Sequence, residues 1–252
     1  RLWKGRFAEL AGQPKPEPPA PPAPAARPAL PEAAPRKPAD VAEGREATLV
    51  FDSSRCIHSR GCVLGEPKVF LANTPGEWIV PDGATPERLS LVAYNCPSGA
   101  ISVQRKDGVR EEAPPVNVIR IRENGPLAFQ AELDIAGHPP GDAAPYRATL
   151  CRCGQSRNKP FCDGSHVAAG FQASGEPATR QSQPLAARNG RLRVEPQRNG
   201  PLEVSGNLEL CAGTGRTVDR LTAARFCRCG QSASKPFCDG THALVGFEAD
   251  GA

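Results

Sequence analysis

The chain has 252 residues, a formal net charge of +4 and only 5% aromatic residues. Its charges of both signs are interspersed, so the sequence has no basic patch of the kind that binds nucleic acid. No apolar run approaches the roughly 20 residues of a membrane-spanning helix, which predicts no membrane span. The length suits two or three small domains, and small cores often depend on metal centres for stability.

Residues 1–45 are expected to form an arm rather than a domain. Eleven prolines lie between positions 14 and 38, interleaved with alanines, and this composition favours an extended, semi-rigid linker without a core. Trp3, Phe7 and Leu10 are spaced close to a helical period. They offer an alternative role for the arm, which is to dock the chain on a larger oxidoreductase complex.

Residues 46–112 are expected to form a small α+β domain with a β-α-β-α-β order. The predicted elements are strands over 47–51, 77–80 and 100–104 and a helix from position 86 to about 94. Thr85 is the predicted N-cap of that helix, Pro86 its first residue and Glu87 a favourable acidic group in its first turn. The helix would place Cys96 just beyond its end.

Three cysteines of this segment have a spacing typical of a cluster site. The run C-I-H-S-R-G-C from Cys56 to Cys62, followed by Cys96 and a proline, resembles the ferredoxin ligand run, with Ser59 at the middle cysteine position. It looks like the divergent single-cluster ferredoxins, which implies a ferredoxin-like domain with an iron–sulfur cluster on these three cysteines. Three thiolates favour [3Fe–4S]; the alternative is [4Fe–4S] with His58 or Ser59 as the fourth ligand.

Two later runs, Cys151 to His166 and Cys227 to His242, repeat the same ligand types 76 positions apart. Each offers three thiolates and one imidazole on a loop rich in residues that favour turns. Such a set suits tetrahedral zinc and also an iron–sulfur cluster. Zinc sites are usually built on longer C-x2-4-C pairs, whereas C-x-C is a natural way to hold one iron of a two-iron cluster. Spacing alone therefore favours iron–sulfur and leaves zinc as the alternative. Asp163 is the predicted N-cap of a short helix.

Both runs match the pattern C-x-C-x2-S-x3-P-x-C-D-G-S/T-H at every position. The pattern resembles the signature of the CDGSH, or mitoNEET-like, iron–sulfur family, and the resemblance implies one [2Fe–2S] cluster in each run. The ligands that it implies are Cys151, Cys153, Cys162 and His166 in the first run and Cys227, Cys229, Cys238 and His242 in the second.

Residues 113–175 and 176–252 are therefore expected to be two β-rich CDGSH modules. Asn-Gly turns at 124–125 and 199–200 predict one hairpin in each, with strands over 116–121 and 127–135 in the first copy and 192–194 and 202–210 in the second. Because relatives with a single motif resemble one another as two-fold dimers, the resemblance implies an internal pseudo-dimer.

Three further expectations concern single positions in these modules. The Gly-Phe pairs at 170–171 and 246–247 are expected to seal the cluster sites. Cys211 is expected to be a buried structural thiol, because it adjoins an apolar strand pattern. His138 is expected to be an exposed loop residue.

The sequence contains no nucleophile–base pair and no phosphate-binding loop, so we expect an electron carrier and not an enzyme. Replacing one thiolate by a neutral imidazole removes a negative charge from the cluster and raises its reduction potential. Positively charged residues within the runs would act in the same direction; they are Arg152, Lys159, Arg228 and Lys235. The expected function is a multi-cluster electron-transfer protein, and its expected partner is a redox protein.

Two other functions remain open at this stage, a cluster-transfer or redox- and pH-sensing protein and a structural zinc protein. Cysteines that fall in ligand patterns rather than in a disulfide framework indicate a reducing compartment. The expected location is the cytoplasm, with the mitochondrial matrix as the alternative.

Overall fold

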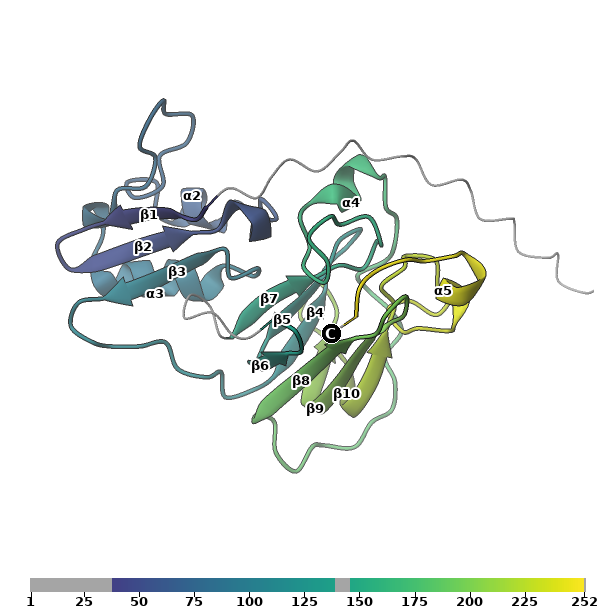
Figure 1. Cartoon of the computed structure of the whole chain (residues 1–252). Coiled ribbons are helices and arrows are strands. Elements are labelled where there is room, and N and C mark those ends of the chain that lie inside the picture. Colours follow the sequence, from purple (N-terminus) through teal and green to yellow (C-terminus); the bar gives the residue numbers. More distant parts are fainter. Residues whose placement is uncertain (1–37, 139–145, 252) are drawn as a thin grey trace, which may run out of the picture.

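The computed structural model describes residues 38–138 and 146–251. This part of the chain is mixed α+β and consists mostly of strands, which form a small sheet and a larger one. Figure 1 shows the small sheet, in purple and blue, beside the larger sheet, in teal to yellow. Most of the predicted arm, including Trp3, Phe7 and Leu10, lies outside the described residues. Within the described ranges, no helix has the length and apolar character that a bilayer crossing requires.

The small sheet is antiparallel and has the order β1-β2-β3. Its strands are β1 (Asp40–Glu43), β2 (Ala47–Phe51) and β3 (Ile101–Arg105). β2 and β3 lie close to two predicted strands, but β1 lies within the segment assigned to the arm. The sequence of β1 lacks the alternation of apolar and polar residues that predicts a strand. The strand forms because it pairs along β2, for example Val41 with Val50.

The helix predicted after Thr85 is present as α3 (Pro86–Asn95). The Thr85 hydroxyl oxygen accepts a hydrogen bond from the Arg88 backbone N–H at 3.5 Å, and Pro86 occupies the first turn, where its missing N–H costs nothing. The helix ends so that Cys96 occupies its C-cap. A second, shorter helix, α2 (Gly61–Gly65), carries Cys62 and packs against α3.

The strand predicted over 77–80 is wrong. Ile79 forms only an isolated bridge with Phe70, and no strand follows on either side of it. Trp78 packs edge-on against Phe51, with 4.9 Å between ring centroids. The apolar residues of this segment therefore serve the core of the small domain, whose β-α-β-α-β order is replaced by two strands, two helices and a third strand.

The larger sheet has seven strands, in the order β6-β8-β9-β4-β5-β7, with β10 paired to β9. Its elements are β4 (Val118–Ile121), β5 (Leu127–Gln130), β6 (Glu132–Ile135), β7 (Arg147–Leu150), β8 (Arg191–Pro196), β9 (Leu202–Cys211) and β10 (Thr217–Phe226). The predicted hairpins are confirmed as β4–β5 and β8–β9. Asn124 and Asn199 adopt left-handed φ values of +47° and +51° in their turns. The strand predicted over 127–135 is interrupted at Ala131, between β5 and β6.

The two sequence repeats exchange strands within this sheet. β4 of the first repeat pairs in parallel with β9 of the second, with Val118 opposite Glu209. β8 of the second repeat pairs in parallel with β6 of the first, with Arg191 opposite Glu132. Adding the 75-residue repeat offset to Glu132 and subtracting it from Arg191 gives positions 207 and 116. These two positions have the same separation as Glu209 and Val118, so both pairs follow one register. The two cross-repeat pairings are therefore equivalent.

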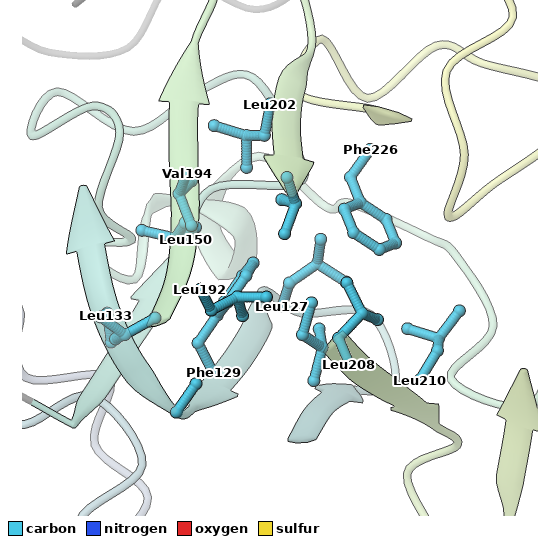
Figure 2. Close-up of a cluster of buried hydrophobic side chains, with 14 of the residues drawn as sticks. Leu127, Phe129, Leu133, Leu150, Leu192, Val194, Leu202, Leu208, Leu210 and Phe226 are labelled. Carbon is cyan, nitrogen blue, oxygen red and sulfur yellow. The ribbon is translucent and has the colours of Figure 1, made fainter. Parts of the chain in front are cut away.

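A single hydrophobic core lies behind these exchanged strands. Figure 2 shows Leu127, Phe129 and Leu150 of the first repeat among Leu202, Leu208 and Phe226 of the second. Burial of each such side chain contributes roughly 1.5–3 kcal/mol. Because the core is shared, separating the repeats would expose apolar side chains of both.

Candidate metal centres

The first loop, defined as residues 151–166, begins directly after β7. The Cys151 N–H donates to the Pro160 carbonyl at 2.8 Å, and the Cys162 N–H donates to the Thr149 carbonyl at 2.9 Å. These two bonds fold the loop back on itself, which brings its early and late cysteines to the same end. The second loop, residues 227–242, begins after β10 and repeats both bonds.

The four ligand side chains of each loop fall into two pairs. In the first loop, Cys151 Sγ lies 3.7 Å from Cys153 Sγ, and Cys162 Sγ lies 3.4 Å from His166 Nδ1. The corresponding distances in the second loop are 3.7 and 3.3 Å. Each loop therefore brings its four predicted ligands together as two close pairs.

Backbone N–H groups point at the sulfur atoms and favour their thiolate forms. Gln155 N–H donates to Cys153 Sγ at 3.3 Å, and Gly164 N–H donates to Cys162 Sγ at 3.5 Å. The second loop has the same two bonds, at 3.4 and 3.5 Å. Each pair of ligands therefore has one sulfur that accepts from the backbone.

A hydrogen bond joins the paired thiols of the first loop. The pKa of Cys151 falls to about 6 because Cys153 Sγ hydrogen-bonds to its thiolate, and the pKa of Cys153 rises because it keeps the shared proton. Burial raises the pKa of Cys162 to about 12 and lowers the pKa of His166. A buried set of this kind needs bound positive charge to become three thiolates and a neutral imidazole.

The aspartate of each loop has a different role from the predicted one. Helix α4 (Ser165–Ala168) has Gly164 and not Asp163 at its N-cap. The Asp163 carboxylate lies one residue earlier, where it accepts from the N–H groups of Ser165 at 3.0 Å and Arg157 at 2.9 Å. It therefore ties the start of the helix to the middle of the loop. Helix α5 (Thr241–Leu244) is arranged in the same way.

The arginine between the first two cysteines of each loop is a structural group. Arg152 is buried, and its guanidinium donates to the carbonyls of Gly125 at 2.8 Å and Ser174 at 3.1 Å. It also donates to two further carbonyls, those of Arg122 and Ala173. The guanidinium carbon lies 5.4 Å from the Phe171 ring centroid. Arg152 therefore joins the hairpin turn to the segment that follows α4.

Of the two Gly-Phe pairs, the second contacts the cysteines of its loop. Phe247 is buried and packs with Cys227 and Cys229. Phe171 lies beneath Arg152, as Phe247 lies beneath Arg228.

The backbones of the two loops lie against each other at Gly230 and Cys153. A Cβ built on Gly230, whose φ is +82°, would lie 2.5 Å from the Cys153 carbonyl oxygen. Burial lowers the pKa of Arg152 to about 10, and the charge of Cys227 in the other loop opposes that lowering. Burial also lowers the pKa of Arg228, opposed in the same way by Cys151. Each arginine thus lies near the first cysteine of the opposite loop.

The three N-terminal cysteines line one cavity of about 370 Å³. Cys56 follows a short turn, Cys62 lies on α2 and Cys96 lies at the end of α3. The cavity wall is largely apolar and includes Phe51, Ile57, Val63, Trp78 and Val92. Burial raises the pKa of both Cys56 and Cys62. The cavity has the size and ligands for a cluster.

Both candidates for a fourth ligand lie on the wall of this cavity. His58 and Ser59 are exposed and lie beside Cys56. His58 has a left-handed φ of +53°, and its backbone N–H donates to Cys56 Sγ at 3.4 Å. The structure thus brings together all the N-terminal residues singled out from sequence.

Other expectations for single residues have mixed outcomes. Cys211 is buried at the end of β9, as expected, and all ten cysteines are free thiols. Lys159 Nζ donates to the Ser156 carbonyl at 2.6 Å, which holds its charge in the loop. His138 is not an exposed loop residue: its ring packs edge-on against Phe161, 5.2 Å between centroids.

Sequence reasoning missed Arg55, Arg147 and Phe161 as residues near the centres. Arg55 Cζ lies 4.8 Å from the Phe161 ring centroid. Each of these two residues directly precedes a predicted ligand, Cys56 or Cys162, which is a signal that the sequence contained. Arg147 carried no such signal, because its approach to Cys96 arises from the docking of the small domain.

Comparison with known proteins supports these assignments. The family model described as "Iron-binding zinc finger CDGSH type" matches residues 120–167 and 199–243. The family model described as "Divergent 4Fe-4S mono-cluster" matches residues 42–106. The "Uncharacterized protein YjdI" of Escherichia coli K12 is 36% identical over 64 residues, which are 25% of this chain and 82% of that protein. Its counterpart in strain O157:H7 matches equally well. The resemblance seen in the sequence is confirmed: the chain is an iron–sulfur protein of the CDGSH family, with two CDGSH repeats after a divergent 4Fe-4S mono-cluster domain.

Proposed function

We propose that this protein is an electron carrier with three iron–sulfur centres. The observation that carries the proposal is the pairing of ligands in each CDGSH loop, since two pairs suit two irons. The first [2Fe–2S] cluster would be held by Cys151 and Cys153 on one iron and by Cys162 and His166 on the other. The second would be held in the same way by Cys227, Cys229, Cys238 and His242.

The chemistry of the ligand set favours electron transfer at a raised potential. One imidazole in place of a thiolate leaves the cluster with less negative charge, so that an added electron is easier to accept. Backbone N–H donors to Cys153 and Cys162 act in the same direction. No covalent chemistry is required of the protein in this role.

The N-terminal centre is proposed to lie on Cys56, Cys62 and Cys96. The matching family description names four irons, and His58 and Ser59 lie on the cavity wall as possible fourth ligands. Three cysteines without such a ligand would hold [3Fe–4S], the form favoured by the sequence. Low-temperature paramagnetic resonance separates the two: a signal from oxidised protein indicates [3Fe–4S]. No signal from oxidised protein, together with a cubane signal after reduction in addition to those of the two [2Fe–2S] centres, indicates [4Fe–4S].

We also propose that the two CDGSH modules form an internal pseudo-dimer. Support comes from the equivalent registers of β4 with β9 and of β6 with β8. Reciprocal approach of Arg152 to Cys227 and of Arg228 to Cys151 supports the same symmetry around the cluster loops.

Exposed apolar residues beside both CDGSH loops support a redox partner protein. Val167 is 76% exposed and Leu244 is 87% exposed, and they lie next to His166 and two residues after His242. A partner docked on either surface would approach the histidine side of a cluster. The partner could be part of a larger oxidoreductase complex, and free thiols throughout the chain suit a reducing compartment.

A second candidate function is cluster transfer or pH sensing. Both ligand histidines are partly exposed, so that protonation from solvent could release them from iron. Incubation with an apo-ferredoxin acceptor separates the two functions: rapid loss of clusters to the acceptor indicates transfer, and reversible reduction with clusters retained indicates electron transport.

Metal and sulfide analysis tests the proposal as a whole. The purified protein should absorb in the visible range and contain iron with inorganic sulfide in nearly equal amounts. Zinc without sulfide would refute the redox function, and only the fold would remain.

A further inference from the structure

The small N-terminal domain docks on the first CDGSH loop. Asn158 Nδ2 in that loop donates to the Ser54 carbonyl at 3.0 Å. Arg55 Nη2 donates to the Arg147 carbonyl at 3.0 Å, at the base of β7. In Figure 1, α4, at the end of the first loop, lies between the small domain and α5, at the end of the second loop. The first loop is therefore the nearer neighbour of the N-terminal centre.

The docking contact joins one predicted cluster ligand to another. Arg55 precedes Cys56, and Phe161 precedes Cys162. The Arg55 guanidinium lies on the Phe161 ring at 4.8 Å, within the range of a cation–π interaction. The route from the N-terminal centre to the first CDGSH centre therefore follows the chain from Cys56 to Arg55, crosses the contact with the Phe161 ring, and follows the chain again to Cys162.

Buried positive charge lies at the same junction. The Arg55 guanidinium is partly buried and lies against the Arg147 backbone, and Arg147 itself is buried. The Arg147 side chain is 1% exposed, and it pairs with Glu111 at 2.6 Å. Nε of both arginines and Nη1 of Arg147 have no hydrogen-bond partner in the described part of the chain. Buried donors are normally satisfied, and a negatively charged cluster beside Cys96 would attract them.

The second loop has the same ring but a different cation. Phe237, the counterpart of Phe161, is covered by Arg180 at 4.3 Å from its centroid. Arg180 comes from the segment that joins the two CDGSH repeats and is 58% exposed on its side chain. No cluster ligand adjoins Arg180 in the sequence. The two CDGSH sites therefore differ in what lies on their aromatic ring.

We propose that the N-terminal centre exchanges electrons with the first CDGSH centre across the Arg55–Phe161 contact. The second CDGSH centre is then reached through the first, by way of the close approach of Gly230 to Cys153. In each step one electron leaves the donor centre, which is oxidised by one equivalent, and reduces the acceptor centre by one equivalent. No bond is made or broken. This order rests on the three-cluster function proposed above.

The test uses the full chain with its clusters loaded, in two matched backgrounds. His242→Cys lowers the potential of the second CDGSH centre, and His166→Cys lowers that of the first. Each protein receives one electron per chain from a flash-excited flavin reductant. Rapid freezing and paramagnetic resonance then follow which centre holds the electron.

The expected result is fast exchange between the N-terminal centre and the first CDGSH centre in the His242→Cys protein. Exchange with the second centre in the His166→Cys protein should be severalfold slower, because the intervening centre no longer accepts the electron readily. Equal rates in the two backgrounds would overturn the proposed order.

Arg55→Gln and Arg180→Gln form the second arm, made in the His242→Cys background. Arg55→Gln should slow the exchange severalfold and lower the potential of the N-terminal centre, whereas Arg180→Gln should change neither. Phe161→Leu and Phe237→Leu are the corresponding pair for the ring. Equal effects within both pairs would refute a role for the Arg55–Phe161 contact.

Failure of the cluster assignment is distinguishable from failure of this order. Iron, sulfide and the resonance signals of each centre are measured first on every variant. Missing sulfide or missing signals would refute the proposed function, whereas three intact centres without preferential exchange would refute only the order of transfer.

Discussion

Gly230 of the second CDGSH loop has no room for a side chain against Cys153 of the first. A Cβ at Gly230 would lie 2.5 Å from the Cys153 carbonyl oxygen and 2.9 Å from its carbonyl carbon. Both contacts are with backbone, which cannot move aside as a flexible side chain would. The second loop therefore needs glycine here for two reasons, the neighbouring loop and its own φ of +82°.

We predict that Gly230→Ala lowers the stability of the protein by more than the cost of placing alanine in a left-handed backbone conformation. The φ value accounts for roughly 1–2 kcal/mol, and overlap with Cys153 adds roughly 1–3 kcal/mol. The measurement is the midpoint of thermal unfolding, followed by visible absorbance. Gly240→Ala is the matched control, since its φ is +90° and a Cβ added there would meet nothing within 4 Å. Equal shifts for the two variants would contradict contact between the loops.

A second prediction concerns the histidine ligand. His166→Cys should lower the reduction potential of the first centre by roughly 100 mV or more, because a fourth thiolate adds negative charge. Potentiometric titration of the protein measures the shift, and His242→Cys should shift the second centre instead. An unchanged potential in both variants would contradict the ligand assignment.

The same variant tests the response to acid. Burial lowers the pKa of His166, so its neutral, iron-binding form persists below the ordinary pKa of histidine, and release should begin only under more acidic conditions. Loss of visible absorbance should then follow as the pH falls. In His166→Cys the first centre should lose this dependence on pH, while the second keeps it.

A third prediction concerns the arginine inside each motif. Arg228 donates to the carbonyls of Gly200 at 3.0 Å and Asp250 at 2.9 Å, and to that of Gln197. Lysine keeps the charge but cannot reach three acceptors with a planar fork, so Arg228→Lys should cost roughly 2–4 kcal/mol by leaving carbonyls unsatisfied. Denaturant unfolding measures this loss.

The control for that substitution is Arg225→Lys in the adjacent strand. Arg225 is exposed and pairs with Glu203 on the surface, where an ion pair contributes at most about 1 kcal/mol. Similar losses for both variants would show that Arg228 acts only through its charge.

A fourth prediction separates the N-terminal centre from the other two. Cys96→Ala should remove the signal of the N-terminal centre and leave both CDGSH signals intact, because the three sites share no ligand. Paramagnetic resonance and iron content measure the loss. Cys211→Ala should leave all three signals, since Cys211 lies in the β9 strand away from the cluster cavity. Loss of a CDGSH signal in Cys96→Ala would contradict independent sites.

Local patterns predicted several elements correctly, and each success had a short-range cause. Thr85 and Pro86 mark the start of α3 because an N-cap and a first-turn proline act within one turn. Asn124 and Asn199 mark the hairpins because their turns need left-handed backbone. The segment around Ile79 was mistaken for a strand, since apolar residues that serve a core without pairing have the same composition.

The sequence by itself determined the chemistry of this protein: which thiols and imidazoles are available, at what spacing, and in how many copies. That information is local, because each CDGSH loop folds back within sixteen positions. Tertiary structure alone decided that β6 pairs with β8, that β1 joins the small sheet, and that Arg55 covers Phe161. These contacts join residues far apart in the chain, and they depend on shared burial, which no short stretch of sequence contains.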